Sequence, residues 1–142
     1  MRVIIAGSRQ FDNPAHIKLI DEAVERSGWR EEITKVFSGT AKGIDRLGER
    51  WALDNHLPVQ RFYPDWKRFG GKLAPLVRNE LMAANADALI CIWDARSRGT
   101  LHMIETARKK EVKLFIYYPY GHPFRFQSYH PTIFEVARMV VE

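Results

Sequence analysis

The sequence has a single cysteine and no long apolar segment, which argues against a disulfide-bonded protein and against a membrane-spanning one. Cys91 is the one cysteine among 142 residues, so it has no partner for an internal disulfide. A chain without disulfides is typical of a reducing compartment, and we expect a cytoplasmic protein. No apolar stretch reaches the roughly 20 residues of a membrane-spanning helix, and we expect no membrane contact. The apolar run 3–6 is also too short for a signal-peptide core.

The common motifs for metals and nucleotide cofactors are also missing. The five histidines have no metal-ligand spacing, and one cysteine makes no zinc pattern, so no metal is expected. No Gly-Lys-Ser or Gly-Lys-Thr completes a Walker A loop. The segment 7–9, Gly-Ser-Arg, lacks the second and third glycines of the dinucleotide fingerprint, which argues against NAD or FAD. No cofactor is therefore evident.

What the sequence does contain is the composition of one globular domain. A hydrophobic fraction of 46% over 142 residues is enough to form one core without disulfides or metals. The formal net charge of +5 favours anionic partners, such as phosphates or nucleic acid, but only weakly. We therefore expect a single domain over residues 1–142.

Short apolar runs alternate with longer segments of helical period, which predicts a Rossmann-like α/β/α sandwich on a parallel sheet. The run 88–93 is apolar throughout, as a central strand covered by helices on both faces must be. The segment 63–72, with Gly70 and Gly71, is expected to be a loop. The expected strands are 2–6, 34–37, 58–62, 88–93 and 114–118, and the expected helices are 14–27, 43–55, 73–85, 99–110 and 131–141.

Three loops of small and basic residues, 7–10, 38–45 and 94–100, each follow an expected strand. In a parallel sheet, ligands bind beyond the carboxyl ends of the strands. Small residues let backbone N–H groups approach an anion, and helix N-termini add partial positive charge. Ordinary turn chemistry explains any one such loop, but the convergence of three favours a phosphate site. The predicted contacts are Gly7, Ser8, Arg9, Ser38, Gly39, Thr40, Ser97, Arg98, Gly99 and Thr100.

Several segments resemble known families. Residues 36–45, Val-Phe-Ser-Gly-Thr-Ala-Lys-Gly-Ile-Asp, resemble the S-G-x-A-x-G-x-D motif of the DNA-processing protein DprA/Smf. The segments 78–82, 86–90 and 97–100 resemble, in the same order, the R-K-x-x-M, A-D-A and G-G-x-G-T motifs of the LOG phosphoribohydrolases. Both families belong to the Rossmannoid SMF/DprA–LOG (SLOG) superfamily.

Within that superfamily, the segment 2–9 with Asp65-Trp66 and Trp93-Asp94 is most similar to the small YspA-like branch. The resemblance covers about residues 1–118 and leaves 119–142 as a C-terminal extension of the single domain. It implies the strand order 3-2-1-4-5 and a ligand phosphate near Gly99-Thr100. The function that follows is binding of a nucleotide or nucleotide-derived ligand, as a sensor or a hydrolase.

The LOG resemblance also implies catalytic positions, and the chain departs from them. It places Arg78 beside the ligand and a glutamate three residues after Thr100, where this chain has Met103. Glu105 is two residues further on, about 200° around a helix, and would point away. Methionine cannot stabilise an oxocarbenium ion, so cleavage of an N-glycosidic bond by the LOG mechanism is doubtful.

The other catalytic candidates are three aspartates, one of which is Asp65 in the expected loop before Trp66. Asp45 either serves the ligand or interacts with the start of its helix, and Asp94 either accepts from a ribose hydroxyl or holds a turn. Asn79 either hydrogen-bonds the ligand or caps a local turn. The sequence leaves open whether any ligand is hydrolysed, at a glycosidic or a phosphate bond.

A single-stranded nucleic acid is the alternative ligand, as the DprA resemblance implies. Basic residues from Arg61 to Arg78, with Tyr63, Trp66 and Phe69 between them, could provide charge and stacking, although a solvated loop with buried aromatics also explains them. The aromatic segment 117–126 either packs on its own domain or forms the interface of a homo-oligomer.

Overall fold

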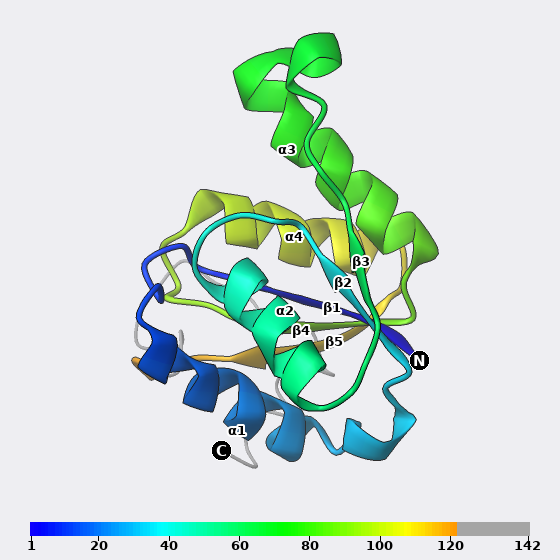
Figure 1. Ribbon diagram of the computed structural model, residues 1–142. Helices are drawn as coiled ribbons and strands as arrows, with labels where there is room; N and C mark the ends of the chain where they lie inside the picture. Colours follow the sequence, from blue (N-terminus) through cyan, green and yellow to red (C-terminus); the bar gives the residue numbers. More distant parts are fainter. Residues whose placement is uncertain (122–142) are drawn as a thin grey trace.

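The computed structural model describes residues 1–121, which form a sheet covered by helices on both faces (Figure 1). All strand pairs are parallel, and the order is β3-β2-β1-β4-β5, so the predicted fold and strand order are confirmed. The strands are β1 (Arg2–Gly7), β2 (Lys35–Ser38), β3 (Val59–Arg61), β4 (Ala88–Ile92) and β5 (Lys113–Tyr117). The predicted last helix, 131–141, and most of the aromatic segment lie outside the described residues.

Two helices cover each face of the sheet (Figure 1). The helices are α1 (Ile17–Ser27), α2 (Ile44–Asp54), α3 (Trp66–Asn85) and α4 (Arg98–Lys109), and short 3₁₀ turns occupy Pro14–His16 and Arg30–Glu32. Alternate residues of β1 face the two layers: Val3 and Ile5 pack under α1 and α2, whereas Ile4 packs under α3 and α4. Every residue of β4 is fully buried, as the apolar run predicted.

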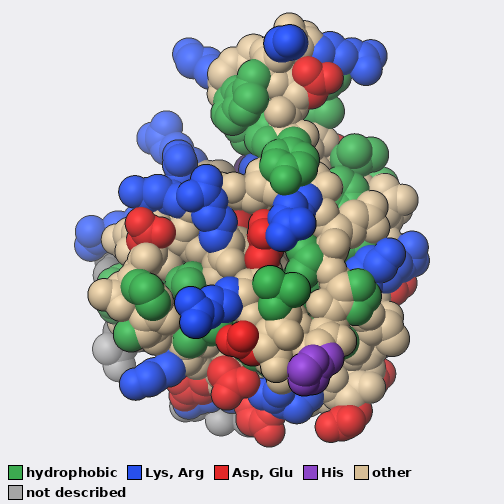
Figure 2. Space-filling view, in the orientation of Figure 1, with side chains coloured by type: hydrophobic (Ala, Val, Ile, Leu, Met, Phe, Trp, Pro, Cys, Tyr) green, Lys and Arg blue, Asp and Glu red, His purple; other side chains and the backbone are tan. Residues whose placement is uncertain are grey.

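The predicted loop 63–72 is wrong in its second half, because α3 begins at Trp66. Asp65 caps this first turn: its Oδ1 accepts the backbone N–H of Arg68 at 3.1 Å. Gly70 then leaves the helical conformation with φ 76° and ψ 177° and introduces a kink. The start of α3 therefore projects beyond the sheet (Figures 1 and 2). Gly70 indicated a break correctly, but the break separates two helical segments.

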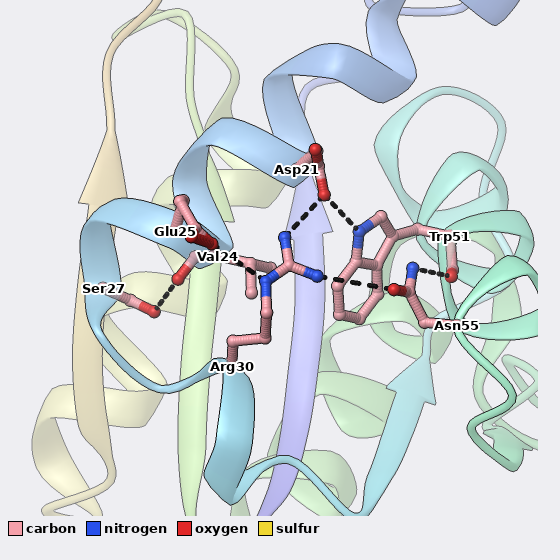
Figure 3. Close-up of polar contacts among 7 residues, drawn as sticks. All are labelled: Asp21, Val24, Glu25, Ser27, Arg30, Trp51 and Asn55. Carbon is pink, nitrogen blue, oxygen red and sulfur yellow. Dashed lines mark hydrogen bonds and ion pairs between the residues drawn. The ribbon is translucent and has the colours of Figure 1, made fainter.

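On the opposite layer, Arg30 connects α1 to α2 (Figure 3). Its guanidinium donates to Asp21 Oδ1 at 2.7 Å and to Glu25 Oε2 at 2.9 Å, both on α1. The same group lies 5.7 Å from the ring centroid of Trp51 on α2 and 3.4 Å from Asn55 Oδ1. The indole Nε1 of Trp51 also donates to Asp21 Oδ1, at 3.2 Å. These hydrogen bonds hold the pKa of Asp21 below its ordinary value.

The contacts of Arg30 predict a measurable contribution to stability. We expect Arg30→Met to lower the free energy of unfolding by about 1–2 kcal/mol, because it removes charge-assisted hydrogen bonds on a half-buried side chain. Arg50→Met is the control: Arg50 is 69% exposed, against 33% for Arg30, and lies 4.0 Å from Asp54. Its loss should stay below about 0.5 kcal/mol. Urea denaturation measures both, and equal losses would contradict the assignment.

Candidate functional site

A cleft of about 760 Å³ opens at the carboxyl edge of the sheet, between the loops that follow β1, β2 and β4 and the length of α3. This is the size range of small-molecule sites. Ten of the fourteen ligand-contact residues predicted from the sequence line it: Gly7, Arg9, Gly39, Thr40, Asp45, Arg78, Asn79, Ser97, Gly99 and Thr100. The structure therefore brings together residues from every predicted loop.

The other four residues, Ser8, Ser38, Asp94 and Arg98, do not line the cleft. Arg98 is exposed at the first position of α4. The Ser8 hydroxyl accepts the backbone N–H of Asp94 at 3.0 Å and so links the first and third loops. The Asp94 carboxylate accepts the N–H groups of residues 96 and 97, at 2.9 and 2.8 Å, which is the turn-holding role weighed for it.

Ser38 has an equivalent role in the second loop. Its hydroxyl donates to Glu49 Oε2 at 2.6 Å and accepts the backbone N–H of Thr40 at 3.1 Å. From the sequence, the two serines were predicted to donate to a ligand. Their actual partners could not be recognised there, because one lies far along the chain and the other lies on the next helix. Their hydroxyl groups stabilise the conformation of the loops and do not line the cleft.

Gly39 lies where two charged side chains meet. A Cβ atom at this position would come within 2.7 Å of Asp45 Oδ2 and 2.9 Å of Arg78 Nη1. Nη1 of Arg78 also donates to the carbonyl of Gly39. Any larger residue would displace one of the two charged groups. The Ser-Gly pair that ends β2 thus makes room for the aspartate of α2 and the arginine of α3.

Asp45 is a buried carboxyl group, only 6% exposed, at the floor of the cleft. Burial raises its pKa from 3.8 to about 6, because the charged form loses its hydration. The positive charge of Arg78 and hydrogen bonds from the backbone N–H groups of Ala41 and Gly7 oppose this shift without cancelling it. Asp45 both organises the first and second loops and presents a titrating group near neutral pH.

Arg78 is held by a chain of side chains that crosses from α3 to α4. Its Nε donates to Asn79 Oδ1 at 3.0 Å, which leaves the Asn79 Nδ2 group to donate to His102 Nδ1 at 3.1 Å. His102 must then accept at Nδ1 and carry its proton at Nε2, 3.5 Å from Thr106 Oγ1. Burial lowers the pKa of Arg78, and Asp45 opposes that change. Asn79 and His102 thus orient the guanidinium.

Four basic side chains line the cleft against the single carboxylate of Asp45: Arg9, Lys42, Arg46 and Arg78. Lys42 is only weakly held by the protein, since the exposed carboxylate of Asp12 lies 3.9 Å from its Nζ. Figure 2 shows Lys and Arg side chains gathered around the hollow below the projecting start of α3. The charge of the cleft suits an anion.

The sequence analysis offered two aromatic residues as stacking partners of a nucleic acid but did not predict an apolar wall along the cleft. Tyr63 and Trp66, followed by Pro75 and Leu76, form it along the start of α3. Their place in the cleft was not predicted because the segment 63–72 was expected to be a loop, and its sequence does not show that it folds back over the carboxyl edge. The two aromatics beside Asp65 were the available signal.

Helical geometry predicted that the position of the LOG glutamate faces the ligand and that the carboxylate two residues later points away from it. Met103 is buried and lines the cleft, whereas Glu105 is exposed and lies outside the lining. Residues 1–121 contain no group of three His, Cys, Asp or Glu side chains that could hold a metal ion. Within the same residues, no helix combines the length and the apolar content needed to cross a bilayer.

The first half of the chain is similar to a known protein family. The model of the YspA, cpYpsA-related SLOG family (YAcAr) matches residues 1–69. The match covers a little less than half of the chain. The match includes the first two loops of the cleft and ends within the first turns of α3, and it confirms the resemblance found in the sequence.

One solved structure shares the fold over nearly the whole chain. The X-ray structure of DNA processing protein A (DprA) from Streptococcus pneumoniae matches with a TM-score of 0.65 and 18% sequence identity. The match covers 99% of this chain but 61% of the DprA chain, so this chain spans about three fifths of that protein. No curated protein matches the chain.

The burial of Asp45 predicts a pH-dependent loss of stability. The folded state binds the Asp45 proton more tightly than the unfolded state, because the pKa is about 6 when folded and 3.8 ordinarily. This group's contribution to the free energy of unfolding therefore falls as pH rises from about 4 to about 6, by roughly 3 kcal/mol, and is constant above. Asp45→Asn should remove this dependence and be the more stable protein at pH 7.

Urea denaturation of both proteins at several pH values between 4 and 7 tests this. The difference between them isolates Asp45 from the other carboxylates. Asp54→Asn, at an exposed position of the same helix, is the control and should change little. A variant that is less stable than the wild type at pH 7, by an amount independent of pH, would show that the protein stabilises the charged carboxylate.

Proposed function

We propose that the cleft binds a nucleotide or a nucleotide-derived ligand, with its phosphate between the start of α4 and the loop that follows β2. The observation that supports this most strongly is the convergence of three loops, each ending a neighbouring parallel strand, on one cleft with an excess of basic side chains. This is the place where parallel α/β sheets bind their ligands.

The start of α4 supports a phosphate contact at that end of the cleft. Ser97 precedes the helix but forms no side-chain cap, and Thr100 Oγ1 donates to Ser97 Oγ at 3.1 Å. The first N–H groups of the helix are thus left for a ligand, where the helix dipole favours negative charge. A Cβ atom added at Gly99 would meet no other atom within 4 Å, so the space beside it is open.

Single-stranded nucleic acid is the second candidate, supported by the projecting start of α3. Lys67, Arg68 and Lys72 are exposed there, close in sequence to the exposed Tyr63 and Trp66. A solved structure that shares this fold is that of a DNA processing protein. Binding of this kind weakens steeply with salt, whereas a small ligand deep in the cleft is less sensitive.

Hydrolysis receives less support than binding. Met103 occupies the place of the LOG glutamate, so Asp45 is the one carboxylate lining the cleft within the described residues. Asp45 accepts two backbone N–H groups, which favours a structural role. We therefore favour ligand binding over hydrolysis of the ligand.

Gly99→Ala provides the sharpest test. The change should stabilise the fold by up to about 1 kcal/mol, since alanine is the better helix former and has room. It should also weaken nucleotide binding at least about tenfold, because the methyl group fills the space of the phosphate. Gly71→Ala, at an equally open helical position outside the cleft lining, should keep full affinity.

Calorimetric titration with AMP, GMP, CMP, UMP and ADP-ribose at 0.15 M salt measures this. Arg9→Met, inside the cleft, should weaken binding, and Arg98→Met, outside it, should leave the affinity within about threefold. If none of these ligands binds, the proposal fails. Binding of an oligonucleotide alone, weakened by salt and unaffected by Gly99→Ala, would favour the nucleic-acid function instead.

A further inference from the structure

Two large aromatic side chains are exposed at the rim of the cleft. Trp66 is 55% exposed and Tyr63 is 71% exposed, whereas the other three tryptophans of the chain, Trp29, Trp51 and Trp93, are 3–4% exposed. Both exposed rings line the cleft. Burial of an aromatic ring is among the largest gains in folding, so the two rings are placed where folding does not use them.

The aromatic rings belong to one end of a cleft whose two ends differ in chemistry. Beside them, Pro64, Pro75 and Leu76 complete a wall that comes entirely from the segment after β3 and from α3. The glycine-rich lining comes from the loops after β1, β2 and β4, which also supply Arg9 and Lys42. The other two basic side chains, Arg46 and Arg78, come from α2 and α3. A nucleotide has the same division between an apolar aromatic ring and a charged phosphate.

The position of Trp66 is built into the local structure. Asp65 caps the turn that Trp66 begins, through the hydrogen bond from the Arg68 backbone. Four residues later, Gly70 adopts φ 76°, which directs this turn away from the axis of the rest of α3. A Cβ atom at Gly70 would meet nothing within 4 Å, so the backbone conformation, and not crowding, requires glycine there. The cap and the kink together hold Trp66 at the rim.

We propose that Trp66, with Tyr63 beside it, is a stacking subsite for the nucleobase of a mononucleotide whose phosphate lies at the start of α4. This inference rests on the proposed function, which places the phosphate, and adds a binding site for the base at the other end of the ligand. Stacking on an indole ring is open to every base, because every base has an aromatic face. The subsite therefore recognises the presence of a base more than its identity.

The test compares a ligand that has a base with one that lacks it. AMP and ribose 5-phosphate share the sugar phosphate, so the base subsite acts on AMP alone. Trp66→Leu keeps an apolar side chain without the ring and should weaken AMP binding about tenfold, while ribose 5-phosphate binds unchanged. Trp66→Phe keeps a ring and should hold AMP within about threefold of the wild type. Leu81→Ala, an exposed apolar residue of α3 outside the cleft lining, is the control.

Tryptophan fluorescence gives a second reading that does not depend on affinity. AMP should quench the emission of the wild type much more than that of Trp66→Phe, because the remaining tryptophans are buried and cannot stack on a base. Melting temperatures of the variants should match the wild type, since Trp66 contributes little to the core.

The outcomes separate the inference from the proposed function. If AMP binds equally well to wild type and Trp66→Leu, and ribose 5-phosphate binds as tightly as AMP, the base subsite is overturned and phosphate binding stands. If neither compound binds, the proposed function fails and the inference fails with it. If Trp66→Leu affects only an oligonucleotide, the rings serve a nucleic acid and the mononucleotide subsite is overturned.

Discussion

Close backbone contacts that tolerate no side chain hold the three loops of the cleft together. A Cβ atom at Gly7 would lie 2.2 Å from the carbonyl oxygen of Ile92, at the end of β4. Gly43 has φ 87°, and a Cβ atom there would lie 2.7 Å from the backbone of Arg9. With the hydrogen bond from Asp94 to Ser8, these contacts fix the loops after β1, β2 and β4 relative to one another. The cleft is therefore preorganised by backbone packing.

The burial of Asp45 and Arg78 beside the loops of the cleft lowers the stability of the protein. Both are held away from water beside Gly39, and burial opposes the charged form of each. A core built for stability alone would avoid two such groups. Their presence at the floor of a cleft is typical of functional sites, where shifted pKa values concentrate. The Asn79–His102 chain supports the arginine from the opposite helix, so its orientation is fixed before any ligand arrives.

The two layers of the protein have different roles. On one side, α1 and α2 are joined by the Arg30 contacts and a large apolar cluster, and they stabilise the sheet (Figure 3). On the other side, α3 and α4 pack on the sheet with their later turns but present their starts to the cleft. The exposed aromatic turn of α3 and the uncapped start of α4 thus line one cleft, which the packed sheet supports.

Local pattern in the sequence was enough to predict the strands and the loops of the site, whereas the strand order came from the resemblance to the SLOG superfamily. The continuous burial of β4 follows from its unbroken apolar run, and the Ser-Gly-Thr and Ser-Arg-Gly-Thr segments indicated where the chain turns at the sheet edge. Which residues in those loops face the cleft depended on contacts between distant parts of the chain. Ser8, Ser38 and Thr100 all carry a hydroxyl group, but only Thr100 lines the cleft. Ser8 and Ser38 instead hydrogen-bond Asp94 and Glu49 and so stabilise the loops. The aromatic wall was likewise decided by tertiary structure, because the kink at Gly70 and the path of α3 over the sheet edge depend on packing that no local period records.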